Sequence, residues 1–190
     1  MSDSTRRSFL KTSAALGAAS LINQTTPAAE GDGLIAIAVI GTGGMGMNHV
    51  GMLSQREDVR IVAVCDVDTN RLQSAVTKVE ENSGRRPDAT GDLRDVLKNS
   101  KIEAVFIATP DHWHGPAAIL ALDAGKHVYV EKPCCHNIRE GRLMTDAVAR
   151  SGKVLQVGTQ SRSTPCVKDA IDRIHAGEIG EVLVAKAWNS

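Results

Sequence analysis

A run of glycines near the start of the chain has the spacing of a phosphate-binding loop. Its pattern is G-x-G-x-x-G. Gly41 allows a tight turn, Gly43 lets the backbone approach a phosphate group, and Gly46 lets the following helix pack closely on the preceding strand. The amino end of that helix offers free N–H groups and the positive end of its dipole to a pyrophosphate. We expect every residue of the loop to contribute: Gly41, Thr42, Gly43, Gly44, Met45 and Gly46.

An acidic residue follows the glycine loop at the distance that a dinucleotide site needs. Asp66 comes 20 residues after Gly46 and directly follows an aliphatic run. A carboxylate at this position accepts hydrogen bonds from the adenosine ribose hydroxyls and repels a 2′-phosphate. Asp68 strengthens this preference, whereas Arg71 weakens it slightly by offering a partner for a phosphate. The spacing therefore predicts NAD as the cofactor, in preference to NADP.

Two further polar segments follow aliphatic runs later in the chain. They are Thr109–His114 and the triplet Glu131-Lys132-Pro133. We expect both at the carboxyl ends of parallel strands, where open α/β sheets bind ligands. Trp113 either covers the edge of a cofactor or packs internally, and His49 is expected only to pack near the glycine loop.

Alternating strand-like and helix-like segments position these residues. The alternation predicts βαβ units and a doubly wound parallel sheet of the Rossmann dinucleotide-binding fold. Aromatic residues make up only 3% of the chain, which fits a core of aliphatic strands. The expected strands are 34–40, 60–65, a short one near 89, 104–108, 127–130 and 154–157. The expected helices are 45–54, 69–82, 92–99, 115–124, 137–150 and 165–176.

The chain divides into three predicted parts. Residues 1–30 form a signal peptide, residues 31–178 form the NAD(P)-binding Rossmann domain, and residues 179–190 begin a truncated second α+β domain. Glu181–Trp188 is strand-like, yet the sequence stops at Ser190 with nothing to pair it. A lone strand cannot satisfy its backbone groups. We therefore expect this sequence to be part of a longer one.

The first part resembles a twin-arginine export signal. Arg6-Arg7 precedes Phe9-Leu10-Lys11, a weakly apolar stretch covers Ala14–Ile22, and Pro27-Ala28-Ala29 resembles a cleavage region. The apolar stretch is shorter than the roughly 20 residues that span a bilayer, so no stable membrane insertion is expected. The twin-arginine translocase is thus a predicted partner. The predicted location is the periplasm or the exterior, after export in the folded state.

Charge and cysteine content exclude other classes. The formal net charge is +0, and removing residues 1–29, with three basic residues and one acidic residue, leaves −2. No basic face is implied, so nucleic acid is not an expected partner. The four cysteines lack metal-ligand spacing, and no metal site is predicted. Cys134 and Cys135 are expected to pack as small residues rather than to form a disulfide.

The order of the motifs resembles that of the glucose–fructose oxidoreductase and inositol dehydrogenase (Gfo/Idh/MocA) family. The shared segments are the glycine loop, Thr109-Pro110-x-x-x-His114, Glu131-Lys132-Pro133 and Gly158-Thr159-Gln160, which cover nearly the whole mature chain. The resemblance implies a nucleotide domain followed by a larger open-sheet domain. That second domain carries most of the substrate site and usually the subunit interface, so a homo-oligomer is expected at full length.

The resemblance also assigns roles to single residues. It places Lys132 and Glu131 beside the nicotinamide as catalytic residues, where an ammonium stabilises a developing alkoxide or relays a proton. The usual general base comes from the second domain, so the 190-residue chain is expected to bind dinucleotide but to turn over substrate poorly. The further residues implied to line the cofactor are Thr109, Pro110, His114, Glu131 and Gln160.

Three functions are compatible with these features. The leading prediction is an NAD(P)-dependent oxidoreductase that transfers hydride between a sugar or polyol hydroxyl and a tightly bound nicotinamide. One alternative is an NAD-dependent glycoside hydrolase that works by transient C3 oxidation and elimination. It would release sugar from an aryl glycoside without accumulating reduced NAD. The other is a non-catalytic dinucleotide-dependent sensor, against which the Glu131-Lys132-Pro133 triplet argues.

Overall fold

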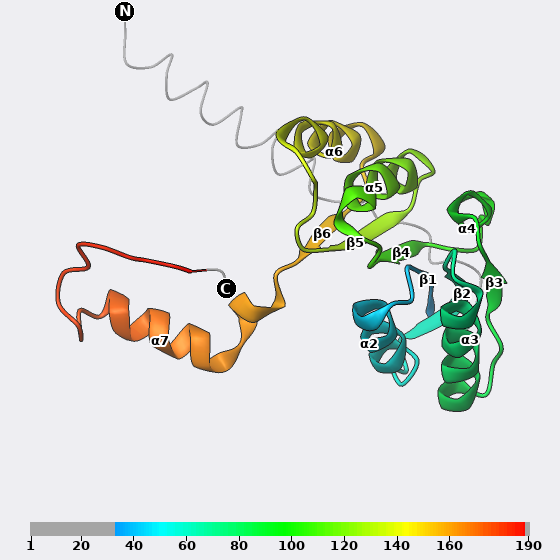
Figure 1. Ribbon diagram of the computed structural model, residues 1–190, viewed down its shortest axis with the longest axis horizontal. Helices are drawn as coiled ribbons and strands as arrows, with labels where there is room; N and C mark the ends of the chain where they lie inside the picture. Colours follow the sequence, from blue (N-terminus) through cyan, green and yellow to red (C-terminus); the bar gives the residue numbers. More distant parts are fainter. Residues whose placement is uncertain (1–32, 189–190) are drawn as a thin grey trace, which may run out of the picture. The chain divides into compact units, whose positions relative to one another are not determined.

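A parallel β-sheet forms the centre of the protein. The computed structural model describes residues 33–188, so the predicted signal at residues 1–30 lies outside the described part. The strands run in the order β3-β2-β1-β4-β5-β6, and every neighbouring pair is parallel (Figure 1). The predicted doubly wound sheet is confirmed. The strands are β1 (Ile35–Ile40), β2 (Val59–Cys65), β3 (Asp88–Thr90), β4 (Ala104–Ile107), β5 (His127–Glu131) and β6 (Leu155–Gly158).

Helices cover both faces of this sheet. Helices α2 and α3 pack on one face, and α4, α5 and α6 pack on the other (Figure 1). Successive strand residues point to opposite faces, so β1 sends Ile37 and Val39 into the first core and Ala38 and Ile40 into the second. The helices are α2 (Gly44–Leu53), α3 (Thr69–Ser83), α4 (Leu93–Lys98), α5 (His114–Asp123) and α6 (Ile138–Ser151).

Polar caps and glycines set the ends of these helices. The carboxylate of Asp68 accepts hydrogen bonds from the first turn of α3, Asp92 does the same for α4, and the side chain of Asn137 caps α6. Helices α3 and α6 end at Gly84 and Gly152, both in the left-handed conformation that glycine adopts without strain. The short connections that result keep the following strands in register.

The strand order reverses between β1 and β4. The chain builds outward from β1 through β2 to β3, and then crosses to β4 and continues outward to β6. Loops on the two sides of this switch point diverge, which opens a crevice at the carboxyl ends of the strands. The glycine loop, Asp66, Thr109, Lys132 and Gln160 all follow strands at this edge of the sheet.

The last described segment is only partly as predicted. Helix α7 (Pro165–His175) forms where expected, but none of its residues is buried. Residues 181–188 are not assigned to a strand. No strand within residues 33–188 pairs with them, and Leu183 and Trp188 are largely exposed. The strand expected there stays a prediction for a longer chain. The assignment of residues 179–190 to a second domain stays a prediction.

Candidate dinucleotide-binding site

The glycine loop turns tightly where β1 meets α2. Gly41 has a φ of +84°, and a Cβ on it would lie 2.6 Å from the backbone nitrogen of Thr109. A Cβ on Gly46 would strike the carbonyl oxygen of Gly41. Both positions therefore need glycine, one for its backbone conformation and both for the close approach of neighbouring backbone. These contacts are the tight turn and the close helix–strand packing expected from the sequence.

The first turn of α2 is open to an anion. Its N-cap residue, Gly43, has no side chain to accept a hydrogen bond, and no acidic residue lies in the first turn. The backbone N–H groups there lack helical partners, and they carry the positive end of the helix dipole. Gly43 and Gly44 line the pocket described below, so a phosphate group in it would meet this helix end.

Asp66 is held in place at the end of β2. Its Oδ2 accepts hydrogen bonds from the backbone N–H of Thr42 at 2.7 Å and from the Thr42 hydroxyl at 3.1 Å. Its Oδ1 accepts one from the backbone N–H of Asp68 at 2.9 Å. A carboxylate oxygen can accept two hydrogen bonds, so Oδ1 keeps capacity for a ribose hydroxyl. Thr42 itself is buried, and it acts on the pocket through Asp66.

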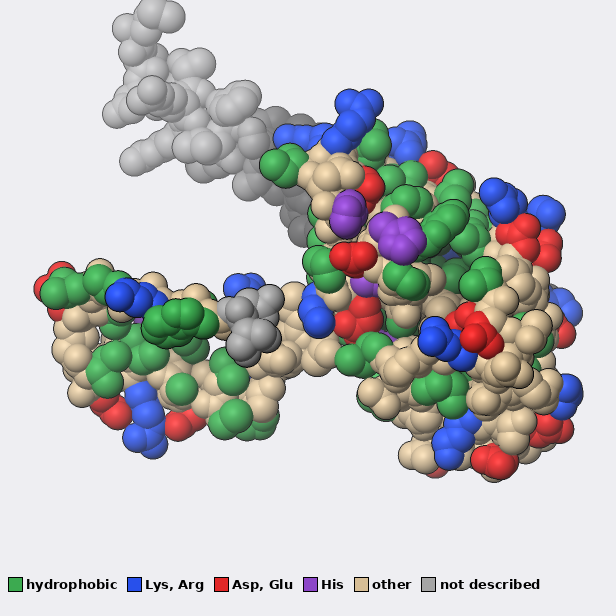
Figure 2. All heavy atoms as spheres, viewed as in Figure 1, with side chains coloured by type: hydrophobic (Ala, Val, Ile, Leu, Met, Phe, Trp, Pro, Cys, Tyr) green, Lys and Arg blue, Asp and Glu red, His purple; other side chains and the backbone are tan. Residues whose placement is uncertain are grey.

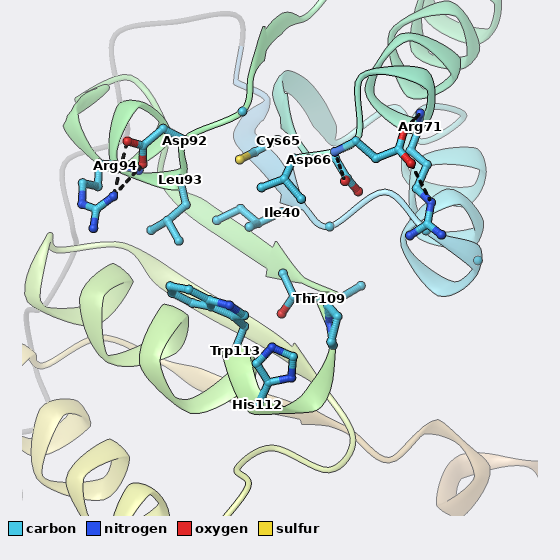
Figure 3. Close-up of a pocket in the computed structure, with 18 residues that line it drawn as sticks. Ile40, Cys65, Asp66, Arg71, Asp92, Leu93, Arg94, Thr109, His112 and Trp113 are labelled. Carbon is cyan, nitrogen blue, oxygen red and sulfur yellow. Dashed lines mark hydrogen bonds and ion pairs between the residues drawn. The ribbon is translucent and has the colours of Figure 1, made fainter.

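A pocket of about 850 Å³ lies at the switch point of the sheet. Its wall comes from the loops after β1, β2 and β4 and from the turn before α4 (Figure 3). Met45 begins the exposed side of α2 and does not line the pocket. The predicted cofactor-binding residues that do line it are Gly41, Gly43, Gly44, Asp66, Thr109 and Pro110.

One part of the pocket wall was not anticipated from the sequence. Asp92 lines it from the turn after β3, and Leu93 and Arg94 line it from the first turn of α4. Trp113, for which the sequence left open a place at the cofactor edge or internal packing, lines the pocket from η1 (Asp111–Trp113). Leu93 and Trp113 reach into the same space from separate elements (Figure 3), offering apolar surface for a flat base. Trp113 therefore lies at the pocket edge. The sequence does place this turn after a short strand, just as the other loops of the site follow strands, and that position is the signal that could have identified it.

Arg71 lies beside the glycine loop. Its Nη1 is 3.3 Å from where a Cβ on Gly43 would be, and its Nε lies 3.8 Å from Oδ2 of Asp68. Hydrogen bonds from the N–H groups of Arg71 and Asn70 lower the pKa of the Asp68 carboxyl. Arg71 thus places a cation on the pocket wall beside the glycine loop, near the carboxylates of Asp66 and Asp68.

The residues of the pocket fit a dinucleotide. The Oγ1 atom of Thr109 is buried and has no hydrogen-bond partner within the described residues. An unpaired buried hydroxyl is costly, so this atom calls for a polar ligand in the pocket. The glycine cradle of α2 and the remaining capacity of Asp66 supply the complementary groups for a pyrophosphate and a ribose.

His114 connects two loops instead of lining the pocket. The side chain is buried at the start of α5, with Nδ1 2.6 Å from the carbonyl oxygen of Pro133 and Nε2 2.8 Å from that of Thr109. It therefore ties the loop after β4 to the loop after β5. A direct contact between His114 and the cofactor stays a prediction.

The predicted catalytic residues lie farther along the same sheet edge. Glu131 ends β5 and is only 4% exposed, whereas the neighbouring Lys132 is exposed. Gln160 begins η2 (Gln160–Ser163) after β6 and is also exposed. None of the three lines the pocket. Their roles beside a nicotinamide stay predictions.

His49 has a more specific place than the sequence indicated. Its Nε2 lies 2.9 Å from Oε1 of Glu131, and both side chains are buried. The expectation that His49 only packs near the glycine loop is therefore incomplete. No local pattern pointed to the pair, because its partner is 82 residues away in the sequence.

The cysteines form no disulfide in the described residues. All four thiols are free, and Sγ of Cys134 lies 3.9 Å from Sγ of Cys135, as expected for two packed residues.

Within residues 33–188 no cluster of three or more His, Cys, Asp or Glu side chains is arranged to hold a metal ion. In the space-filling view, histidine and acidic side chains lie next to one another on one face (Figure 2). The distances put Asp111 within 3.8 Å of His112 and 3.7 Å of His136.

The fold and the pocket together define a dinucleotide-binding Rossmann domain. Comparison with known families agrees: residues 35–159 match the Gfo/Idh/MocA family, described as an oxidoreductase family with an NAD-binding Rossmann fold. The chain belongs to this family. The resemblance noted in the motifs is thereby confirmed, and so is NAD as the cofactor that the family's fold binds.

Relatives of the chain include dehydrogenases and glycosidases. It is 34% identical to an inositol 2-dehydrogenase of Rubrobacter xylanophilus over 82% of this chain and 44% of that protein. It is 36% identical to a glycosyl hydrolase family 109 protein of Shewanella over 74% of this chain and 36% of that one. A structure of scyllo-inositol dehydrogenase from Lactobacillus casei, with bound NAD(H) and scyllo-inositol, superposes with a TM-score of 0.69 at 25% identity. This superposition covers 78% of the present chain and 43% of the Lactobacillus casei chain. The chain thus spans less than half the length of these proteins.

The export signal is also matched by a known family. Residues 3–22 match the twin-arginine translocation pathway signal sequence, which confirms the predicted signal and its route. These residues lie outside the described part of the structure. Of the helices within residues 33–188, none has the length and apolar character to cross a membrane.

Proposed function

We propose that this protein is a periplasmic NAD-dependent oxidoreductase that acts on a hydroxyl group of a sugar or polyol. The observation that carries the proposal is the carboxyl edge of the sheet, where the pocket follows β1, β2 and β4 and Lys132 follows the next strand, β5. The inositol dehydrogenases among its relatives support a polyol substrate. The signal supports export, and the greater length of the relatives supports a second domain. A homo-oligomer stays a prediction that the family resemblance implies.

Different residues along the sheet edge would bind the cofactor and assist the reaction. The amino end of α2 would hold the pyrophosphate, and Asp66 would receive the adenosine ribose. A nicotinamide held there would supply the redox chemistry as the acceptor of the substrate hydride. The ammonium of Lys132 would stabilise negative charge on the hydroxyl oxygen as its proton passes to a general base of the proposed second domain. Tight binding of the cofactor suits a compartment where free dinucleotide is scarce.

Replacing the lysine tests this assignment. In the full-length protein, the change Lys132→Met should lower NAD-dependent oxidation of a panel of inositols and sugars by roughly 10²- to 10⁴-fold, while the dissociation constant for NAD stays within about threefold. Turnover is followed by nicotinamide absorbance and binding by calorimetry. The control is Lys101→Met, which removes an exposed lysine in the loop before β4, at the opposite end of the strands. Unchanged turnover in the Lys132 variant would remove the role given to that residue.

The family 109 glycosidase relatives favour a second candidate function. In that reaction, oxidation of a sugar at C3 acidifies the neighbouring C–H bond, and elimination expels the leaving group and forms a double bond. Addition of water to this double bond and reduction of the C3 ketone then give the free sugar. The same pocket and the same lysine would serve it. Release of the aryl alcohol from aryl glycosides without net accumulation of reduced NAD supports this candidate. Stoichiometric accumulation of reduced NAD with free polyols supports the dehydrogenase.

A further inference from the structure

A buried carboxylate joins helix α2 to the end of β5. Oε1 of Glu131 lies 2.9 Å from Nε2 of His49 and accepts a hydrogen bond from the Tyr129 hydroxyl at 3.2 Å. Its other oxygen, Oε2, accepts the backbone N–H of Lys132 at 3.2 Å. Glu131 is 4% exposed and His49 is 7% exposed. A carboxylate this deeply buried depends on its hydrogen-bond donors, so losing one is costly.

Aromatic side chains and Gly158 pack around Glu131 and restrict the position of its carboxylate. The His49 ring lies edge-on to Tyr129 with ring centroids 5.2 Å apart, and Tyr129 stacks on Phe106 at 4.9 Å. On the remaining side, a Cβ on Gly158 would lie 3.0 Å from Oε1 of Glu131 and would strike the Tyr129 hydroxyl. The glycine of the Gly158-Thr159-Gln160 segment is therefore explained by the space that Glu131 and Tyr129 occupy.

Helix α2 consequently contacts both the pocket and the end of β5. Its first turn lines the pocket through Gly43 and Gly44, and His49, on its second turn, contacts Glu131 next to Lys132. A helix is stiff over this distance, so the glycine loop and the Lys132 backbone share one rigid support. The side chain of Lys132 is exposed.

We propose that His49 is a positioning residue, which acts through Glu131 to fix the backbone of Lys132 relative to the dinucleotide site. The inference rests on the proposed function, because it assigns Lys132 to the reaction. His49 does not reach the reacting atoms, since it is buried behind Glu131. Displacing a catalytic group by about 1 Å can lower a rate by roughly 10²-fold, so loss of the contact should show in turnover rather than in cofactor affinity.

Three variants separate positioning from a merely structural role. His49→Phe keeps a ring against Tyr129 and removes the nitrogen that faces Glu131, whereas His49→Gln keeps an N–H donor on a side chain long enough to reach it. Lys126→Met is the matched control. It removes a buried lysine that donates to the carbonyl oxygens of Asn99 and Ile102 at the opposite edge of the sheet, so it lowers stability without touching the pair.

We expect His49→Phe to lower kcat on the order of 10- to 100-fold with the NAD dissociation constant within about threefold, and His49→Gln to recover most of the loss. Lys126→Met should leave kcat at the wild-type value below its melting temperature. Equal kcat in wild type and His49→Phe, or an equal loss in His49→Phe and Lys126→Met, would overturn the proposal.

A second readout does not depend on activity. In amide NMR spectra of the protein, the N–H signal of Lys132 should shift in His49→Phe and stay in place in Lys126→Met, because only the first variant disturbs its acceptor. An unmoved Lys132 signal would also overturn the proposal. If the full-length wild type oxidises no substrate while this signal shifts, the proposed function fails and the positioning contact stands. If His49→Phe does not fold, Tyr129→Phe, which removes the second donor to the same oxygen, takes its place in both measurements.

Discussion

Cys65 ends β2 with its thiol buried at the back of the pocket, next to Asp66. Burial raises the pKa of this thiol to about 12, and the nearby carboxylates of Asp66, Asp92 and Asp95 add to the effect. The thiolate is the reactive form of cysteine, so Cys65 should behave as an inert apolar residue. This matters for a protein that is exported, because a reactive thiol in the cofactor pocket would be open to oxidation.

The chemical consequence is measurable with an alkylating reagent. At about pH 8, Cys65 should react with iodoacetamide at least about a hundredfold more slowly than the exposed Cys166, since its thiolate fraction is far smaller. Timed labelling followed by mass spectrometry of the two peptides gives both rates in one sample. Similar rates would show that the Cys65 thiol is neither buried nor protonated as described.

At the scale of elements, the close packing of β1 against α2 depends on the missing side chain of Gly46. Gly46→Ala should destabilise the fold by about 1–3 kcal/mol or prevent folding, because its Cβ would strike the Gly41 carbonyl oxygen. Gly44→Ala is the control, since a Cβ there meets nothing within 4 Å and alanine favours the helix. Urea unfolding curves compare the two variants. Equal stability would mean that the junction can relax around the added methyl group.

Local pattern predicted these elements well because their causes are local. Strands β1 and β2 are largely aliphatic runs followed by Gly41 and Asp66, and Asp68 and Asp92 cap the helices that they precede. Contacts between distant residues had no such signal. The His49–Glu131 pair and the two carbonyl contacts of His114 depend on how the sheet stacks its helices. The strand expected at Glu181–Trp188 stays a prediction, since strand-like sequence needs a partner strand and none within residues 33–188 pairs with it.

For the molecule as a whole, His127 should make stability depend on pH. It begins β5, and its Nδ1 accepts the backbone N–H of Val154, just before β6. Burial, and then the charge of Lys153, lower the pKa of His127 from its ordinary value of 6.5. The fold therefore holds the neutral ring, and the unfolded chain binds the proton more readily. This contribution to stability is complete above pH 6.5 and is lost as the pH falls toward the folded-state pKa.

A variant isolates this contribution from that of other titrating groups. His127→Asn keeps an oxygen that can accept the Val154 N–H but does not titrate. Between about pH 7.5 and pH 5.5, wild type should lose more unfolding free energy than the variant, as measured by urea denaturation at each pH. A parallel loss in both proteins would show that His127 is protonated equally in the folded and unfolded chains.

The indole of Trp113 lies at the rim of the pocket and is 43% exposed. The chain has only one other tryptophan, Trp188, which is 84% exposed. The emission of these two fluorophores therefore separates into a solvent-like component and one that an adenine ring could quench by stacking. Replacing Trp188 by phenylalanine would leave a single intrinsic optical probe at the mouth of the site, so that occupancy could be followed without a label.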